Sequence, residues 1–244
     1  LVVYIIILLS IRRVKQKNIH LEGIVKERTK EVVIQKQDAE KQRDIAEHQK
    51  ELVEQAHREI TDSINYAERI QRSFLATDDI LDANLEEYFV FFQPKEVVSG
   101  DFYWADKLSN GNFAMVNADS TGHGVPGAMV SVVCNNGLNR SVREHGLTIP
   151  GEILDKTREI VVQEFKKSEE DVKDGMDIAL CSIEGMKLQY AGAYNPLWII
   201  RNGEIIETKA NKQPIGQFDH PEPYTTHSFN LEKGDANYFC SDGY

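Results

Sequence analysis

Residues 21–75 constrain the fold most, because they contain no proline and a single glycine, Gly23. The segment is rich in Glu, Lys, Gln and Ala, which favour helix. Counting sevens back from Phe74, every residue is apolar: Ala67, Ile60, Val53, Ala46, Ala39, Val32 and Val25. The companion positions, four residues earlier, are glutamines in the middle of the segment. This pattern predicts one long helix and a parallel homodimeric coiled coil of modest stability over residues 21–75. The alternative is a lone solvated helix.

An apolar run, "LVVYIIILLSI", occupies residues 1–11, and a basic run, "RRVKQK", follows it. A membrane-spanning helix needs about 20 apolar residues, so this run alone is too short. Basic residues after the run are typical of a cytoplasmic anchor, whereas a signal peptide carries them before it. We therefore expect residues 1–11 to be the end of a transmembrane helix in the cell inner membrane. A signal-peptide core or a buried strand is the alternative.

Composition excludes some classes of function. The net charge of −11 argues against a nucleic-acid partner, because phosphate binding needs a basic surface. Cys134, Cys181 and Cys240 lie far apart without a C-x-x-C spacing, which disfavours a zinc knuckle or a disulfide framework. We expect all three to be buried apolar residues in a reducing compartment.

The pattern changes after Leu75, which divides the chain into a linker and coiled coil at 12–75 and a globular domain at 76–244. We expect that domain to be truncated at its C-terminal end. Short aromatic and β-branched runs, beginning with "YFVFFQP" at residue 88, predict strands. Two helices are expected at 126–145 and 150–167, and hairpin turns at "EGMK" and "RNGE". These elements predict an α+β fold, an antiparallel β-sandwich flanked by helices, and not a doubly wound parallel sheet.

The stretch "NADSTGHGVPGAM" contains a G-x-G-x-x-G pattern at Gly122, Gly124 and Gly127. It follows a predicted strand and precedes a predicted helix, as a dinucleotide-binding loop requires. About twenty residues further on, however, the chain is still helical and basic, where a second strand ending in an acidic residue is needed. Pro126 also stands where a backbone N–H would face the pyrophosphate. A nucleotide-binding domain is therefore the weakest alternative.

Three aspartates each stand near a glycine at the end of a predicted strand, in "SGDFYW", "NADSTGHG" and "CSDGY". They are Asp101, Asp119 and Asp242. Oxygen ligands from several strand ends, without clustered histidines, are what Mg²⁺ or Mn²⁺ prefers. Two such ions could polarise water and neutralise charge on a phosphoryl group. The alternative is that these Asp-Gly pairs are ordinary turns, and spacing alone leaves both open.

The blocks "SGDFYW", "ADSTGHGVPGAM", "DGMDIAL", "YAGAYNPLWIIRNGEI", "KQPIG" and "SDG" resemble, in this order, the SpoIIE-like branch of the metal-dependent PPM serine/threonine phosphatases. "YAERIQRSFL" resembles the helix that commonly leads into this domain. The resemblance covers roughly residues 66–244 and leaves out the coiled coil and the apolar start.

The resemblance implies a two-layer β-sandwich with two Mn²⁺ or Mg²⁺ ions at one end. Asp119 would ligate metal through its carboxylate and Ser120 through its backbone carbonyl. Asp242 would bridge or ligate, and Asp101 would complete the ligand shell or hold a metal-bound water. A bridging hydroxide would then attack phosphoserine or phosphothreonine directly, with no phospho-enzyme.

Other residues are weaker candidates for the site. Asp174 and Asp177 fall where some relatives hold an accessory ion. The family also carries a further acidic ligand after the "SDG" block. His123, inside the glycine loop, is either a general acid or, more commonly for such a residue, a solvent-facing turn residue. Cys134 has no evident histidine partner, and the chain lacks the C-x₅-R signature of a cysteine phosphatase.

Together these features predict the output domain of a membrane-linked bacterial-type signalling protein, with the phosphatase domain in the cytoplasm. Its substrate would be a phosphorylated regulatory protein, such as an anti-sigma-factor antagonist. One alternative is a catalytically inactive phosphatase fold that serves as a signalling or docking module. The other is the nucleotide-binding domain built on Gly122, Gly124 and Gly127.

Overall fold

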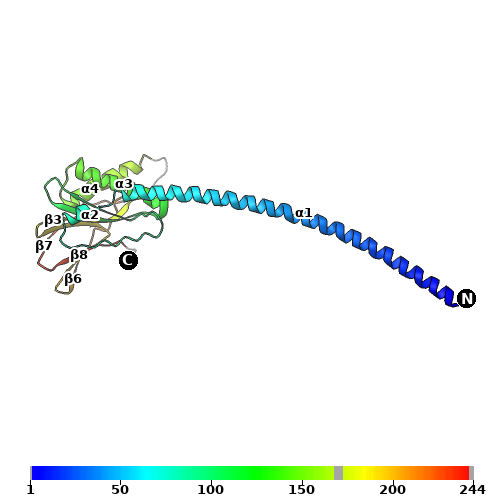
Figure 1. Cartoon of the computed structure of the whole chain (residues 1–244). Helices are drawn as coiled ribbons and strands as arrows, with labels where there is room; N and C mark the ends of the chain where they lie inside the picture. The colour runs from blue at the N-terminus through cyan, green and yellow to red at the C-terminus, as the bar shows by residue number, and fades with distance from the viewer. Residues whose placement is uncertain (1, 168–172, 242–244) are drawn as a thin grey trace. The chain divides into compact units, whose positions relative to one another are not determined.

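The computed structural model describes residues 2–167 and 173–241 (Figure 1). The chain divides into two compact units, Leu1–Thr61 and Asp62–Tyr244, which are considered separately below. The domain boundaries expected after residues 11 and 75 stay predictions.

Helix α1 runs over Val2–Arg72 without interruption, as the absence of proline predicts. In this single chain the apolar heptad positions of the first unit face solvent, and Val53 and Ile60 are 68% and 59% exposed. Pairing of two such helices stays a prediction. Among the described helices, none contains an apolar stretch long enough to cross a bilayer.

The second unit contains two antiparallel sheets, which confirms the predicted α+β sandwich and excludes a doubly wound parallel sheet from the described residues. The larger sheet has the strand order β1 (Phe102–Lys107), β2 (Phe113–Ser120), β3 (Met176–Glu184), β4 (Lys187–Ala193) and β7 (His227–Asn230). The smaller sheet has the order β6 (Glu204–Thr208), β5 (Leu197–Arg201) and β8 (Ala236–Tyr238). The predicted hairpin turns join β3 to β4 and β5 to β6.

Two helices cover one face of the larger sheet, α3 (Gly124–Arg143) and α4 (Pro150–Phe165), and they lie side by side in Figure 1. A third, α2, is a single short turn at Asp78–Asp82. Alternate residues of β2, Ala114, Val116 and Ala118, pack under α3 against Cys134 and Leu138. The intervening positions face the smaller sheet. There Cys181 and Tyr190 meet Leu197 and Ile199 in a second core.

Some local predictions were wrong. Residues 88–94 form no strand, and the four consecutive side chains at 88–91 are all exposed. A half-buried strand needs apolar and polar residues to alternate, and residues 88–92 are instead five consecutive aromatic or aliphatic residues. Cys240 was expected to be buried, but like Trp198 on β5 it is only half-buried. Each lies on or beside the smaller sheet, whose outer face has no helix over it among the described residues.

Candidate functional site

Three of the predicted aspartates occupy one row across neighbouring strands. Asp119 on β2 lies directly opposite Asp177 on β3. On the other side of β2, Phe102 pairs with Ala118, and the Ser120 amide donates a hydrogen bond of 3.3 Å to the Gly100 carbonyl. This continued register puts Asp101 opposite Asp119. The fold therefore brings together Asp101, Asp119 and Asp177, although the first and the last lie 76 positions apart in the sequence.

All three carboxylates belong to the same face of the sheet, because directly opposed residues point the same way. The neighbouring residues Phe102, Ala118 and Ile178 belong to the helix-side core. The aspartates therefore lie on the opposite face, toward the smaller sheet, and each is half-buried. This row stands at the end of the larger sheet where β1 and β3 begin and β2 ends.

The glycine loop after β2 packs against the segment that carries Asp101. A Cβ atom on Gly100 would lie 2.5 Å from both the Ser120 and the Gly122 carbonyl oxygens. A Cβ on Gly127, in the first turn of α3, would collide with the Gly122 carbonyl. Without side chains at Gly100 and Gly127, the segment before β1, the loop after β2 and the first turn of α3 can come into backbone contact. In this contact the Ser120 and Gly122 carbonyls face Gly100. The loop serves close backbone packing, and the sheets formed by the described residues are antiparallel, unlike the parallel sheet of a dinucleotide-binding fold.

Thr121 ties this loop to the segment before β3. Its amide donates to the Gly175 carbonyl at 2.9 Å, and its hydroxyl accepts from the Gly175 amide at 3.1 Å. Asp174 therefore lies beside the loop that begins at Ser120, next to the aspartate row but outside it. Both weaker candidates, Asp174 and Asp177, thus belong to the same end of the sheet.

His123 lies at the N-cap of α3 with an exposed side chain. Its Nδ1 atom is 2.7 Å from the Glu96 carboxylate, whose other oxygen would lie 2.5 Å from a Cβ atom added to Gly124. The ring is thereby oriented by a carboxylate from the segment that leads to Asp101. Nothing places the ring among the aspartates, so its role as a general acid stays a prediction.

Sequence reasoning missed Gln71, near the end of α1. Its buried amide donates to the Ser99 carbonyl at 2.5 Å and accepts from the Ser99 amide at 3.0 Å. The Ser99 hydroxyl in turn accepts from the Asp101 amide at 3.0 Å. Gln71 therefore fixes the backbone that positions Asp101. No sequence signal marks it, because glutamine is common throughout this helix.

Cys134 lies under the site on the helix side of the sheet. Burial raises the pKa of its thiol to about 12. A thiol with so high a pKa is protonated at neutral pH and is a poor nucleophile. This agrees with the expectation that Cys134 is a buried apolar residue, as is Cys181.

The donors at this end suit a small divalent cation. Asp101, Asp119 and Asp177 offer carboxylate oxygens, and two residues before Asp119 the buried Oδ1 of Asn117 has no hydrogen-bond partner among the described residues. Hard oxygen donors of this kind fit Mg²⁺ or Mn²⁺. Within residues 2–167 and 173–241, however, no three His, Cys, Asp or Glu side chains gather closely enough to enclose one ion. Asp242 falls outside the described residues.

Several known proteins resemble this chain in sequence or fold. The family model of stage II sporulation protein E (SpoIIE) matches residues 109–244, more than half of the chain. The solved SiaA-PP2C domain of Pseudomonas aeruginosa is 29% identical, with a TM-score of 0.67 over 77% of this chain and 74% of that one. A PP2C phosphatase domain of SpoIIE from Bacillus subtilis, with a fragment of its regulatory domain, is 19% identical over 57% of this chain and 39% of that one, with a TM-score of 0.45. The S. agalactiae serine/threonine phosphatase is 20% identical over 64% and 77%, with a TM-score of 0.48. No curated protein matches the chain.

Proposed function

The chain belongs to the SpoIIE family of PPM-type phosphatases, and from this we propose that it removes phosphate from phosphoserine or phosphothreonine on a regulatory protein. The single observation that supports this chemistry best is the row of Asp101, Asp119 and Asp177 across three adjacent strands. A row of carboxylates facing one space is a poor arrangement for stability and a good one for holding cations.

We propose that two Mn²⁺ or Mg²⁺ ions bind at this end of the sheet. Asp119, the Ser120 carbonyl and Asp101 would hold them together with Asp242, and Asp174 and Asp177 are the candidates for an accessory ion. When bound, such ions activate water and neutralise charge on the phosphoryl group.

The chain's own residues would then orient the substrate. Helix α3 begins directly after the glycine loop, so the positive end of its dipole stands beside the candidate site. Helix N-termini attract phosphate groups. The hydrogen bonds between Thr121 and Gly175 and the contact of Gly100 with Ser120 hold the loop in place. The site would therefore be rigid before a phosphoprotein arrives.

The wider setting is proposed on sequence grounds. The heptads at 21–75 would join two chains in a homodimer, and residues 1–11 would attach the protein to the inner membrane with its phosphatase unit in the cytoplasm. An anti-sigma-factor antagonist is the substrate type that the family suggests. Analytical ultracentrifugation of the 244-residue chain tests the dimer, and a monomer at 100 times the protein concentration of the activity assay would exclude it.

Hydrolysis of p-nitrophenyl phosphate and of a phosphoserine peptide by the 244-residue chain, with and without Mn²⁺, tests the activity. We expect Asp119→Asn to lower the Mn²⁺-dependent rate at least about 100-fold without lowering the Tm of the metal-free protein. Glu184→Gln, an exposed change at the other end of β3, is the control and should leave the rate unaltered.

Three results would contradict the proposal. Absence of Mn²⁺ stimulation in the wild-type chain would favour the inactive docking module. Equal losses of rate and of stability in Asp119→Asn would make that residue structural. A rise in Tm with NAD or ATP, but none with Mn²⁺, would favour the nucleotide-binding alternative.

A further inference from the structure

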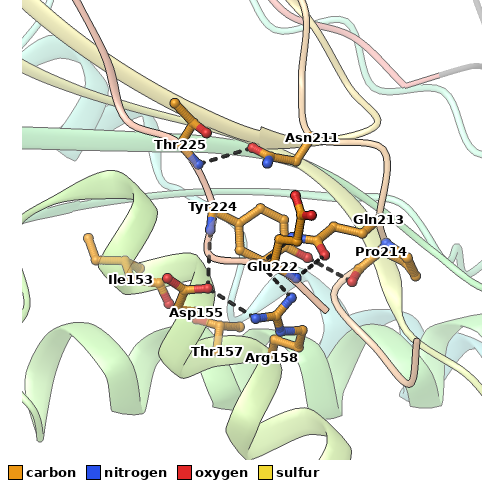
Figure 2. A network of polar contacts seen from close by, with 10 residues as sticks. All are labelled: Ile153, Asp155, Thr157, Arg158, Asn211, Gln213, Pro214, Glu222, Tyr224 and Thr225. Atoms are coloured by element: carbon orange, nitrogen blue, oxygen red, sulfur yellow. Dashed lines mark hydrogen bonds and ion pairs between the residues drawn. The ribbon is translucent and has the colours of Figure 1, made fainter. Parts of the chain in front are cut away.

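The connection between β6 and β7 folds back on itself and is closed at its base by side chains (Figure 2). The Gln213 side chain bonds to the backbone of Glu222 in both directions, accepting at 2.9 Å and donating at 2.6 Å. The Tyr224 hydroxyl donates to the Pro214 carbonyl at 2.7 Å, and the Thr225 amide donates to the Asn211 side chain at 3.0 Å. Residues 211–214 and 222–225 are therefore held together as the two sides of one loop.

Helix α4 clamps the same base. The Asp155 carboxylate accepts from the Tyr224 amide at 3.2 Å and from Arg158 at 3.1 Å. Arg158 also donates to the Glu222 carbonyl at 3.0 Å, and its guanidinium lies 4.9 Å from the centre of the Tyr224 ring. Tyr224 is buried, with 5% of its surface exposed. These interactions at the buried base fix the backbone conformation of the loop, and with it the position of the residues at its tip.

The loop presents a tip at residues 217–221, in which every residue is exposed. They are Gln217, Phe218, Asp219, His220 and Pro221. Phe218 has 40% of its surface in solvent although it is a large apolar residue. Exposed aromatic side chains on a rigid scaffold are typical of recognition surfaces.

The tip begins beside the candidate site. Ile215 exchanges two backbone hydrogen bonds with Met176, the residue before Asp177, at 3.1 and 2.8 Å. A Cβ on Gly216 would lie 3.2 Å from the Asp174 carbonyl. Phe218 follows two residues later, a span of at most about 7 Å. The Cα atom of Phe218 therefore lies within this distance of Gly216, near the end of the larger sheet that carries the aspartate row.

The charge of the second unit points to the kind of polypeptide that the tip meets. Residues 62–244 contain 16 Lys and Arg against 29 Asp and Glu, a net charge of −13. Such a surface repels a phosphorylated segment with acidic neighbours and attracts one with basic neighbours. Asp219 adds a carboxylate at the tip itself.

We propose that residues 217–221 form a substrate-recognition loop that contacts the chain flanking the phosphorylated residue. Phe218 takes an apolar side chain of the substrate, and Asp219 takes a basic one. This inference rests on the proposed phosphatase function and adds a preference for the sequence around the phosphoserine.

Binding of peptides that carry a non-hydrolysable phosphonate in place of phosphoserine tests the inference without turnover. One fluorescent peptide has Phe and Arg beside the phosphonate, and the other has Gly and Glu. In fluorescence polarisation with Mn²⁺ present, we expect the wild-type chain to bind the first at least about tenfold more tightly. The double variant Phe218→Ala/Asp219→Asn should reduce this ratio below about threefold.

Met186→Ala is the matched control, because Met186 is an exposed apolar residue at the turn at the far end of β3. It should leave the ratio unaltered, and both variants should hydrolyse p-nitrophenyl phosphate at the wild-type rate. A wild-type chain that binds both peptides equally, or a double variant that keeps the full ratio, would overturn the inference. A different result would contradict the phosphatase proposal itself: the wild-type chain would not hydrolyse p-nitrophenyl phosphate in the presence of Mn²⁺.

Discussion

Gly100→Ala tests whether close backbone contact organises the candidate site. The new Cβ would lie 2.5 Å from two carbonyl oxygens, those of Ser120 and Gly122. Carbon and carbonyl oxygen atoms approach closely only to about 3.3 Å, so the segments must separate by about 0.8 Å. Both obstacles are backbone atoms, which cannot rotate away as a side chain would. The displacement therefore falls on the segments that carry Asp101 and Asp119.

The magnitude follows from that displacement. Overpacking of this kind costs about 1–3 kcal/mol. In a domain of this size, each kcal/mol lowers Tm by about 2–4 °C. Activity should fall further, because a misplacement of about 1 Å can cost about 100-fold in rate. We therefore expect a Tm lower by about 2–12 °C and a rate of p-nitrophenyl phosphate hydrolysis reduced at least about tenfold, measured where both proteins are folded.

Gly185→Ala is the control for Gly100→Ala, because it should lower stability without displacing the residues of the candidate site. Gly185 lies in the turn between β3 and β4 with a φ of 59°, and a Cβ added there would have no atom within 4 Å. Alanine there costs about 1–2 kcal/mol through backbone strain alone. The Tm of this variant should fall, but its rate should stay that of the wild type. A Gly100→Ala protein with normal Tm and normal rate would refute the role of the contact.

Three further outcomes are expected. Gln71→Leu removes a buried amide that holds the backbone before Asp101 and leaves its partners unpaired, so the free energy of unfolding in urea should fall by about 1–3 kcal/mol; an unchanged value would show that the amide is dispensable. With a thiol-disulfide reagent at pH 8, half-buried Cys240 should react in the native protein and Cys134 only after unfolding, because burial raises the pKa of the Cys134 thiol to about 12; rapid native reaction of both would contradict this. Hydrogen bonding to Arg201 lowers the pKa of Asp235 in the folded state, so its stabilisation is present above an unfolded pKa of about 4 and is lost as pH falls through the lower folded value. Asp235→Asn should therefore flatten the acid side of a plot of Tm against pH, and an unaltered acid side would rule this out.

The elements of the fold could be predicted where local chemistry decides them. The absence of proline over residues 21–75 predicts a helix, and the structure places α1 there. The short apolar run "FAMV" predicts a strand, and the structure places β2 there over Phe113–Ser120. "RNGE" predicts a turn, and Asn202 and Gly203 join β5 to β6. Each of these features depends only on neighbours along the chain.

Register and long-range contacts could not be predicted in this way. The pairing of Asp177 with Asp119 depends on how β3 aligns with β2, and 55 residues that include two helices lie between those strands. Asp177 was therefore only a weak candidate from sequence. Gln71 was missed because its partner, Ser99, is 28 residues away. The apolar residues at 88–91 misled the strand prediction because hydrophobicity without alternation does not determine a partner strand.

The positions of Asp119 and Asp177 argue against the alternative that the aspartates of the candidate site are ordinary turn residues. A turn residue lies between strands, whereas Asp119 lies inside β2 and Asp177 inside β3. Like charges directly opposite each other on adjacent strands destabilise a sheet, so packing alone gives no reason for this pair. A cation bound between them would reverse the sign of that interaction. The unit should therefore gain stability from Mn²⁺ at neutral pH, and Asp177→Asn should raise the Tm of the metal-free protein while it reduces the further gain from Mn²⁺. If the wild-type chain and Asp177→Asn had the same Tm without metal and the same rise in Tm with Mn²⁺, the pair would take no part in cation binding.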